Sequence, residues 1–103
     1  MRVPLAPWDF WRNTLGSPTS VCAPMVDQSD LPFRLLCREL GTSLCYTPML
    51  HARLLTSVRA YGALHFDPLE ADDTRDRPLF AQLAGHDPAT VLAAGRQVQG
   101  RPP

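Results

Sequence analysis

Cysteine and histidine are the residues of this chain that could act as nucleophiles or metal ligands, but their spacing points to neither role. Cys22, Cys37, Cys45 and His51 carry the thiol and imidazole groups that bind zinc in many proteins. No two of the cysteines have the close C-x-x-C spacing of structural zinc sites. Two lie in apolar segments and the third on the apolar face of a predicted helix. We therefore interpret all three as small buried hydrophobic residues and predict no metal site.

Two other positions could contact a ligand. Gln82 is a polar residue inside the apolar segment Pro78–Ala84. A buried amide needs hydrogen-bond partners, which come from a neighbouring strand or loop or from a ligand. Pro24, Met25 and Val26 follow a short apolar segment, at the end of a strand where α/β barrels build their active sites. From the residues alone, the favoured interpretation is a hydrogen bond to a neighbouring strand or loop for Gln82, and a strand end in an apolar core for Pro24, Met25 and Val26.

Composition excludes several kinds of chemistry. The chain has 103 residues, enough for one small domain, and its ten basic residues are all arginine. Without lysine, Schiff-base chemistry and a P-loop-type phosphate site are excluded. A net charge of zero gives no electrostatic sign of nucleic acid or an anionic membrane as partner.

Three cysteines, an odd number, do not indicate a disulfide framework. The N-terminal segment does not have the pattern of a signal peptide, and no apolar run approaches the roughly 20 residues that cross a bilayer. These features predict a soluble protein of a reducing compartment, the cytoplasm or alternatively the nucleus. The sequence leaves the oligomeric state open.

Strands and helices are predicted to alternate. Three apolar segments without polar alternation are typical of strands buried in a parallel sheet: 21–26, 43–47 and 78–84. A helix is predicted after each, and repeated strand–helix units imply a parallel sheet with right-handed crossovers. Three units are too few for an eight-stranded barrel, which takes about 250 residues. The chain is therefore either a very small α/β protein or the front part of a larger one, and its size favours the second.

The first of the three helices has the strongest signals. Ser29 is its predicted N-cap and Gly41 its end. Its predicted apolar face has the spacing i, i+3, i+4, i+7 and consists of Phe33, Leu36, Cys37 and Leu40. The second helix, over Met49–Arg59, has a weaker pattern. The third begins after a predicted cap at Asp87 and is weakened by Gly95.

Two segments lie outside this alternation. Residues 1–18 are predicted to form a lead-in with a short helix, on one face of which lie Trp8, Trp11 and Leu15. The polar, acidic segment 62–76 is predicted to be a solvated surface loop.

Several linked motifs resemble the tRNA-dihydrouridine synthase family. They are A-P-M-V-D-Q-S at 23–29, F-R-L-L-C-R at 33–38, Y-T-P-M at 46–49 and R-P-L-F-A-Q-L at 77–83, followed by Gly85 and Asp87-Pro88. The lead-in F-W-R-N-T-L-G-S-P at 10–18 is similar to the eukaryotic subgroup that modifies positions 16 and 17 of the tRNA D-loop. The motifs occur in the family's order from Phe10 to about Ala94, which makes the resemblance specific.

The resemblance implies a fold, a cofactor and a substrate. The family has an FMN-binding (β/α)8 barrel followed by a helical domain. NAD(P)H reduces FMN, reduced FMN delivers a hydride to a uracil ring in tRNA, and a cysteine from a later strand protonates the neighbouring carbon. The resemblance makes Pro24, Met25 and Val26 FMN contacts, largely through their backbone. It also makes Gln82 a partner of the flavin ring edge. It implies neither a metal nor a membrane.

The chain is expected to be a truncated member of that family. The expected fold is α/β, a partial (β/α)8 TIM barrel with its first three βα units, divided into the lead-in 1–18 and a truncated FMN-binding domain 19–103. The family's Asn-Leu-Gly-Cys-Pro-like segment is missing, so no catalytic residue is assigned and the chain is expected to be inactive alone. The alternative is a non-catalytic truncated isoform that acts as an interaction fragment or is degraded. The motifs disfavour another FMN barrel, such as a dihydroorotate dehydrogenase relative.

Overall fold

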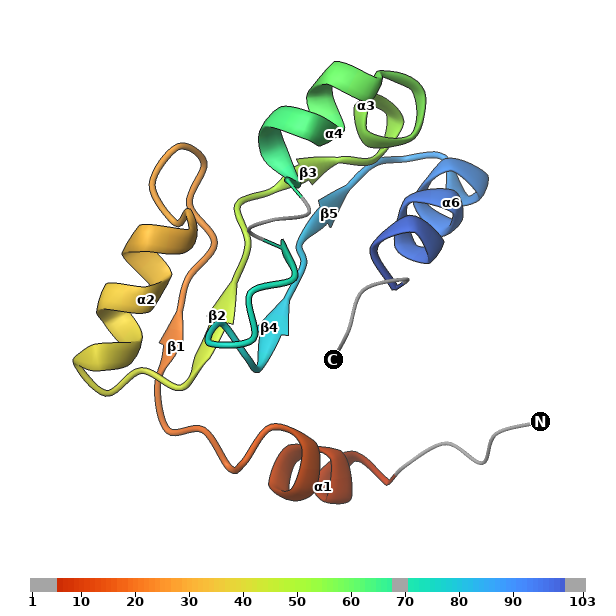
Figure 1. Ribbon diagram of the computed structural model, residues 1–103. Helices are drawn as coiled ribbons and strands as arrows, with labels where there is room; N and C mark the ends of the chain where they lie inside the picture. Colours follow the sequence, from red (N-terminus) through yellow and green to blue (C-terminus); the bar gives the residue numbers. More distant parts are fainter. Residues whose placement is uncertain (1–5, 68–70, 100–103) are drawn as a thin grey trace.

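The computed structural model describes residues 6–67 and 71–99, so the first five residues of the lead-in and residues 68–70 and 100–103 lie outside the described residues. A parallel sheet forms its centre (Figure 1). Its strands, in spatial order, are β1 (Val21–Cys22), β2 (Leu44–Tyr46) and β4 (Leu79–Phe80). The parallel pairing of β1 with β2 and of β2 with β4 confirms the predicted arrangement of strands.

Two of these strands resume after a break. β3 (Leu50–His51) continues the chain beyond β2 and pairs in parallel with β5 (Leu83–Ala84), which continues beyond β4. Three residues, Thr47–Met49, separate β2 from β3, whereas two, Ala81 and Gln82, separate β4 from β5. The unequal lengths interrupt the ladder as a β-bulge does. The strand predicted to stop at Pro48 therefore extends past it.

Helices follow the strands in the predicted order. The helical segments are α1 (Pro7–Asp9), the π-helical turn η1 (Phe10–Thr14), α2 (Leu31–Glu39), α3 (Ala52–Ser57), α4 (Arg59–His65) and α6 (Pro88–Gln99). The helix predicted over Met49–Arg59 begins later, because its first residues form β3, and it divides at Val58 into α3 and α4. The order confirms an α/β chain with parallel strands.

The buried face of α2 differs from the predicted apolar face. Its buried residue is Arg34, whereas Leu36 is exposed and Leu40 is 81% exposed. The predicted N-cap is also wrong. Asp30 caps the helix by accepting from the Phe33 N–H at 3.4 Å, while Ser29 is fully buried and bonded elsewhere. An ion pair determines which face of α2 is buried, because Arg34 donates to the buried carboxylate of Asp76.

Strand burial also departs from the prediction of strands buried on both faces. Val21 is 48% exposed beside a buried Cys22, and every residue of β4 and β5 is only half-buried. Both β1 and β4 are edge strands within the described sheet, so each has a neighbouring strand on one side only. Edge position explains their exposure.

The main core lies where β3 and β5 meet α3 and α6. Its buried members are Leu50, Ala52, Leu55, Phe66, Ala71 and Ala94, with Val91 and Val98 packed against them. Leu92 of α6 points away from this core and is exposed.

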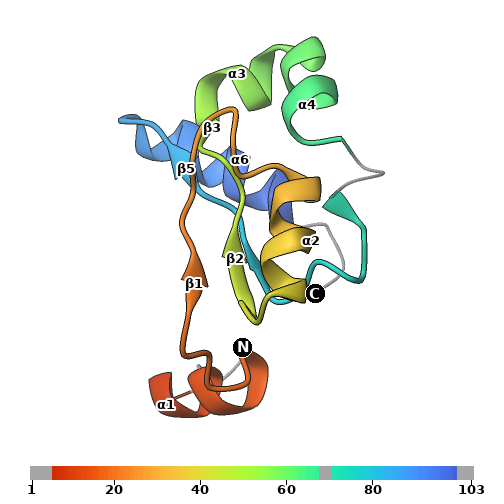
Figure 2. The same cartoon turned by 90° about the vertical axis from the view of Figure 1, so that its left-hand side faces the viewer.

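The lead-in packs at the end of the sheet where β1, β2 and β4 begin (Figures 1 and 2). The ring of Phe10 is parallel to that of Phe80, with centroids 6.4 Å apart, and Leu15 is buried. Trp8 is 67% exposed, so it does not belong to the packed face that the spacing of Trp8, Trp11 and Leu15 predicts. Phe10, the first residue of the π-helical turn, packs against the sheet instead.

The prediction of a surface loop over 62–76 is wrong at both ends of that segment. Its first part belongs to α4, which runs to His65, and its last residue, Asp76, is fully buried. The acidic residue Asp73 does lie near the surface and pairs with the exposed Arg75 at 2.7 Å. That neighbouring arginine holds the pKa of Asp73 down to about 2.

We expect Gly85→Ala to lower the free energy of unfolding by about 1–2 kcal/mol. A Cβ at this position would lie 2.8 Å from Val91 Cγ2 and 3.2 Å from the Ala52 Cβ, between β5 and the core. The matched control is Gly95→Ala in α6, whose Cβ would meet nothing within 4 Å. It is expected to stabilise the helix by about 0.5–1 kcal/mol. Urea unfolding of the two variants measures both effects, and equal effects would contradict the packing described here.

Candidate functional site

The segments that follow the three paired strands lie at one end of the sheet, because the strands are parallel. The chain continues as Ala23–Val26 after β1, Thr47–Met49 after β2 and Ala81–Gln82 after β4. In parallel α/β sheets, ligands bind beyond the carboxyl ends of the strands. Of the predicted site residues, Pro24, Met25 and Val26 follow the carboxyl end of β1, whereas Gln82 lies in the break between β4 and β5.

A tight turn fixes the first segment. The Met25 carbonyl accepts from the backbone N–H of Gln28 at 3.1 Å and of Ser29 at 2.9 Å. The Ser29 hydroxyl accepts from the Met25 N–H at 2.8 Å and donates to the Met25 carbonyl at 3.1 Å. Asp27 has a φ of 62°, which lets the chain reverse within five residues. The Met25–Ser29 turn is thus closed by its own hydrogen bonds.

Two backbone donors of this turn, the N–H groups of Val26 and Asp27, have no protein acceptor among the described residues. The Val26 N–H makes no hydrogen bond within the described residues, and Val26 is 57% exposed. Since the Met25 N–H already donates to the Ser29 hydroxyl, Val26 supplies the first free donor along the chain after β1. A ligand with a carbonyl or other acceptor could use it.

The segment Ala81–Gln82 leaves the side chain of Gln82 without a partner among the described residues. The Gln82 N–H donates to the Thr47 hydroxyl at 3.1 Å and its carbonyl accepts from the Leu50 N–H at 2.8 Å. The half-buried carboxamide has no hydrogen-bond partner among residues 6–67 and 71–99. The neighbouring strand, which is the partner favoured by the sequence alone, therefore bonds to the backbone of Gln82 but not to its side chain.

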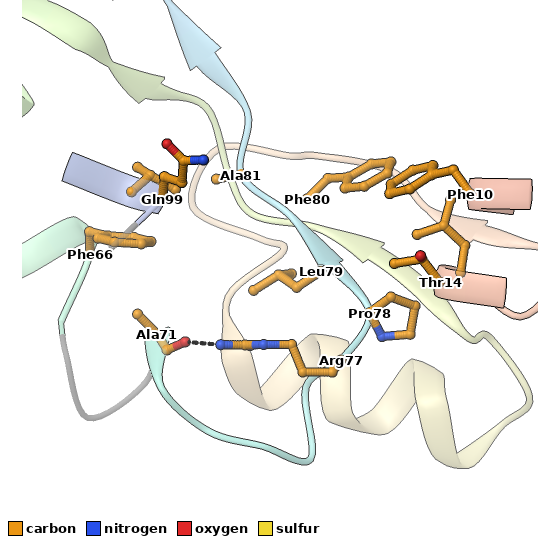
Figure 3. A pocket seen from close by; sticks show the side chains of 12 residues that line it. Phe10, Thr14, Phe66, Ala71, Arg77, Pro78, Leu79, Phe80, Ala81 and Gln99 are labelled. Carbon is orange, nitrogen blue, oxygen red and sulfur yellow. Dashed lines mark hydrogen bonds between the residues drawn. The ribbon is translucent and has the colours of Figure 1, made fainter. Parts of the chain in front are cut away.

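The two cavities described here do not enclose the four predicted residues together. One, of about 650 Å³, lies between α2, α4 and β3 and includes Val26, His51 and His65 in its lining. The other, of about 470 Å³, runs beside β4 from the lead-in to α6 (Figure 3). Pro24, Met25 and Gln82 line neither cavity.

Asp76, Arg34 and Arg38 form a buried charge cluster between α2 and the segment before β4. The sequence did not predict it. Both oxygens of Asp76 accept from arginines of α2: Oδ2 from Arg34 Nε at 2.8 Å, and Oδ1 from Arg38 Nε at 2.9 Å. Arg34 is 4% exposed and Asp76 is fully buried. Two arginines four residues apart share one helix face, and this spacing was the available signal.

The arginines also hold the backbone of the loops around the sheet. Arg34 donates to the Ser29 carbonyl at 2.7 Å, and Arg38 donates to the carbonyls of Ser43, of Arg77 at 3.0 Å and of Pro78 at 2.8 Å. The cluster therefore connects the end of the Met25–Ser29 turn, the start of β2 and the start of β4.

The cysteines behave as the sequence analysis expects of packed residues. Cys22 and Cys45 are buried register partners in β1 and β2, while Cys37 is half-buried. Burial raises the pKa of Cys22 to about 11 and also raises that of Cys45. Neither thiol is activated as a nucleophile, because the thiolate is the reactive form.

His51 has a structural role. Its side chain caps α3 by accepting from the Leu54 N–H, and its own N–H donates to the Tyr61 hydroxyl at 2.9 Å. Among the described residues, no group of three or more His, Cys, Asp or Glu side chains is arranged to hold a metal ion. No helix in that part of the chain is both long and apolar enough to cross a membrane.

Comparisons with known proteins agree with one another. The family model for dihydrouridine synthase matches residues 21–101. The chain is 42% identical over 89 residues to tRNA-dihydrouridine(16/17) synthase (NAD(P)(+)) of Saccharomyces cerevisiae, covering 86% of this chain and 21% of that protein. It is 43% identical over 94 residues to the tRNA-dihydrouridine(16/17) synthase-like protein of Mus musculus, covering 89% and 19%. It is also 38% identical over 84 residues to the tRNA-dihydrouridine(20a/20b) synthase-like protein of Homo sapiens, covering 81% and 25%.

The chain spans about a fifth of the length of the curated relatives it matches first. The match includes β1, β2 and β4 and the segments after them.

Proposed function

This chain belongs to the dihydrouridine synthase family, and from that premise we propose that it forms the first three βα units of the FMN-binding (β/α)8 barrel of a tRNA-dihydrouridine synthase. The proposed substrate is uridine at positions 16 and 17 of the tRNA D-loop, with NAD(P)H as the reductant. The proposed location is the cytoplasm, with the nucleus as the alternative. The proposal is supported by the names of the relatives with identities of 42–43%, which are 16/17 synthases or proteins like them.

The observation that carries the proposal is that two polar groups have no partner among the described residues: the Val26 N–H in the turn after β1, and the carboxamide of Gln82 in the break between β4 and β5. The edge of the flavin ring alternates carbonyl acceptors and an N–H donor. A carboxamide offers both a donor and an acceptor, so the unpartnered side chain of Gln82 matches that edge. The free Val26 N–H matches a flavin acceptor, and Pro24 and Met25 shape the backbone beside it. The donor set of these residues thus fits FMN.

In this proposal, FMN supplies the hydride chemistry and the chain supplies binding and orientation. Gln82 and Val26 fix the ring by hydrogen bonds, and the Met25–Ser29 turn holds Val26 at the strand end. No proton donor is assigned, because the thiols of Cys22 and Cys45 are buried with raised pKa values. We therefore propose that these 103 residues are inactive as an isolated polypeptide. The alternative function is that of a non-catalytic interaction fragment.

A chimeric enzyme tests the proposal. In the chimera, this chain replaces the matching segment of the Saccharomyces cerevisiae 16/17 synthase. The chimera is expressed in a yeast strain whose own 16/17 synthase has been deleted. We expect the chimera to copurify with FMN and to restore dihydrouridine at positions 16 and 17, measured by mass spectrometry of purified tRNA. The 103-residue chain alone, expressed in the same strain, is expected to restore none.

The intact yeast enzyme and an empty vector set the upper and lower limits of the assay. A chimera that accumulates as a folded protein but contains no flavin and leaves the tRNA unmodified would contradict the proposed function. Dihydrouridine formed by the isolated 103-residue chain would overturn its proposed inactivity.

A further inference from the structure

We propose that Arg34 is a positioning residue for the flavin, acting through Ser29 on the backbone of Met25 and Val26. This inference rests on the proposed function, since it concerns the same strand-end site. Arg34 lies on α2, and the resemblance to the family did not identify it as a flavin contact.

The contacts form a continuous path from a buried carboxylate to the strand end. Asp76 Oδ2 accepts from Arg34 Nε at 2.8 Å, and a terminal nitrogen of Arg34 donates to the Ser29 carbonyl at 2.7 Å. The Ser29 hydroxyl then binds both the N–H and the carbonyl of Met25, at 2.8 and 3.1 Å. Val26, with its free N–H, is the next residue.

Burial makes this path rigid. Ser29 and Asp76 are fully buried and Arg34 is 4% exposed, so water cannot readily replace any of the three contacts. The Ser29 carbonyl has no other hydrogen-bond donor among the described residues. A buried carbonyl without a donor is unfavourable, so loss of Arg34 is expected to release the turn from α2.

The guanidinium geometry explains why this residue is arginine. One planar group donates in two directions at once, toward the Asp76 carboxylate and toward the Ser29 carbonyl. Lysine would keep the charge beside Asp76 but has a single ammonium group, which cannot reproduce the planar fork. Arg34→Lys therefore keeps a positive charge beside Asp76 but loses the contact that holds the Met25–Ser29 turn.

Arg38 provides a matched control on the same helix. It donates to the same carboxylate, at 2.8–2.9 Å, but its other contacts are the carbonyls of Ser43, Arg77 and Pro78 rather than Ser29. Arg38→Lys should therefore disturb the buried cluster to a similar degree without releasing the Met25–Ser29 turn.

The test measures FMN dissociation constants of the chimeric enzyme by titrating its flavin-free form with FMN and following the quenching of flavin fluorescence. We expect Arg34→Lys to weaken FMN binding at least tenfold and Arg38→Lys to change it less than threefold. Urea unfolding of both variants is expected to show similar losses of stability. Ser29→Ala removes only the hydroxyl that bridges Met25, so it is expected to weaken binding at least fivefold.

Equal effects of Arg34→Lys and Arg38→Lys on the dissociation constant would overturn the inference, because Arg34 would then act only through stability. Unchanged binding in Ser29→Ala would also overturn it, and this variant decides the question if Arg34→Lys does not fold. Failure of the proposed function is distinguishable, because the unsubstituted chimera would then bind no FMN.

Discussion

Replacing Asp76 by asparagine is expected to lower the free energy of unfolding of this chain by about 3–5 kcal/mol. The carboxylate is fully buried and accepts from Arg34 and Arg38, whose side chains are 5% and 12% exposed. Asparagine keeps the shape but removes the negative charge, so two cationic groups would remain in a site with little water. Removing one member of a buried ion cluster is far more costly than its net contribution, because the other members stay uncompensated.

A matched control lies three residues away in the same segment. Asp73 also pairs with an arginine, Arg75, but that arginine is 72% exposed. Because this pair is open to solvent at Arg75, Asp73→Asn is expected to lower the urea midpoint much less than Asp76→Asn does. Urea unfolding followed by circular dichroism measures both variants. A loss for Asp76→Asn no larger than that for Asp73→Asn would contradict the assigned role of the cluster.

The order of elements was predictable because local signals determine it. Apolar segments without alternation mark the strands around Cys22, Cys45 and Phe80, and capping residues mark the helices between them. These signals act over a few residues and do not depend on the rest of the chain. The resemblance to the dihydrouridine synthase family also rests on short motifs, and the family assignment is confirmed.

The buried side of α2 was not predictable from the same signals. Apolar periodicity favours the face with Leu36 and Leu40, both of which are exposed. The face that the structure buries is chosen by a carboxylate more than 30 residues away in sequence, Asp76. A hydrophobic pattern cannot reveal an ion cluster, because each of its members taken singly looks like a surface residue.

The candidate site was predictable only in part. Pro24, Met25, Val26 and Gln82 were named from the resemblance, and their role as FMN contacts stays a prediction. The sequence could not indicate which of their polar groups are free. That depends on Ser29 taking the Met25 N–H and on Thr47 taking the Gln82 N–H, and both contacts require the folded turn and the break between β2 and β3.

Replacing the side chain of Gln82 is expected to change the affinity for FMN without changing the stability of the protein. Gln82→Ala in the chimeric enzyme is expected to raise the FMN dissociation constant by roughly 5- to 150-fold, equivalent to about 1–3 kcal/mol. The reason is that polar atoms of the bound ring would lose their hydrogen-bond partner. The carboxamide has no hydrogen bond to the described part of the chain, so the same substitution is expected to change the urea midpoint little.

Gln97→Ala is the matched control, because its side chain does bond to the protein. Gln97 Nε2 donates to the Leu55 carbonyl at 3.3 Å and joins α6 to α3, away from the strand ends. This variant should therefore lose stability, by about 0.5–1.5 kcal/mol, and keep its FMN affinity. Gln82→Ala is thus expected to weaken FMN binding but not stability, and Gln97→Ala to lower stability but not FMN binding. If Gln82→Ala leaves the FMN affinity unchanged, the carboxamide does not contact the flavin, and the hydrogen bonds that hold the ring must come from elsewhere in the enzyme.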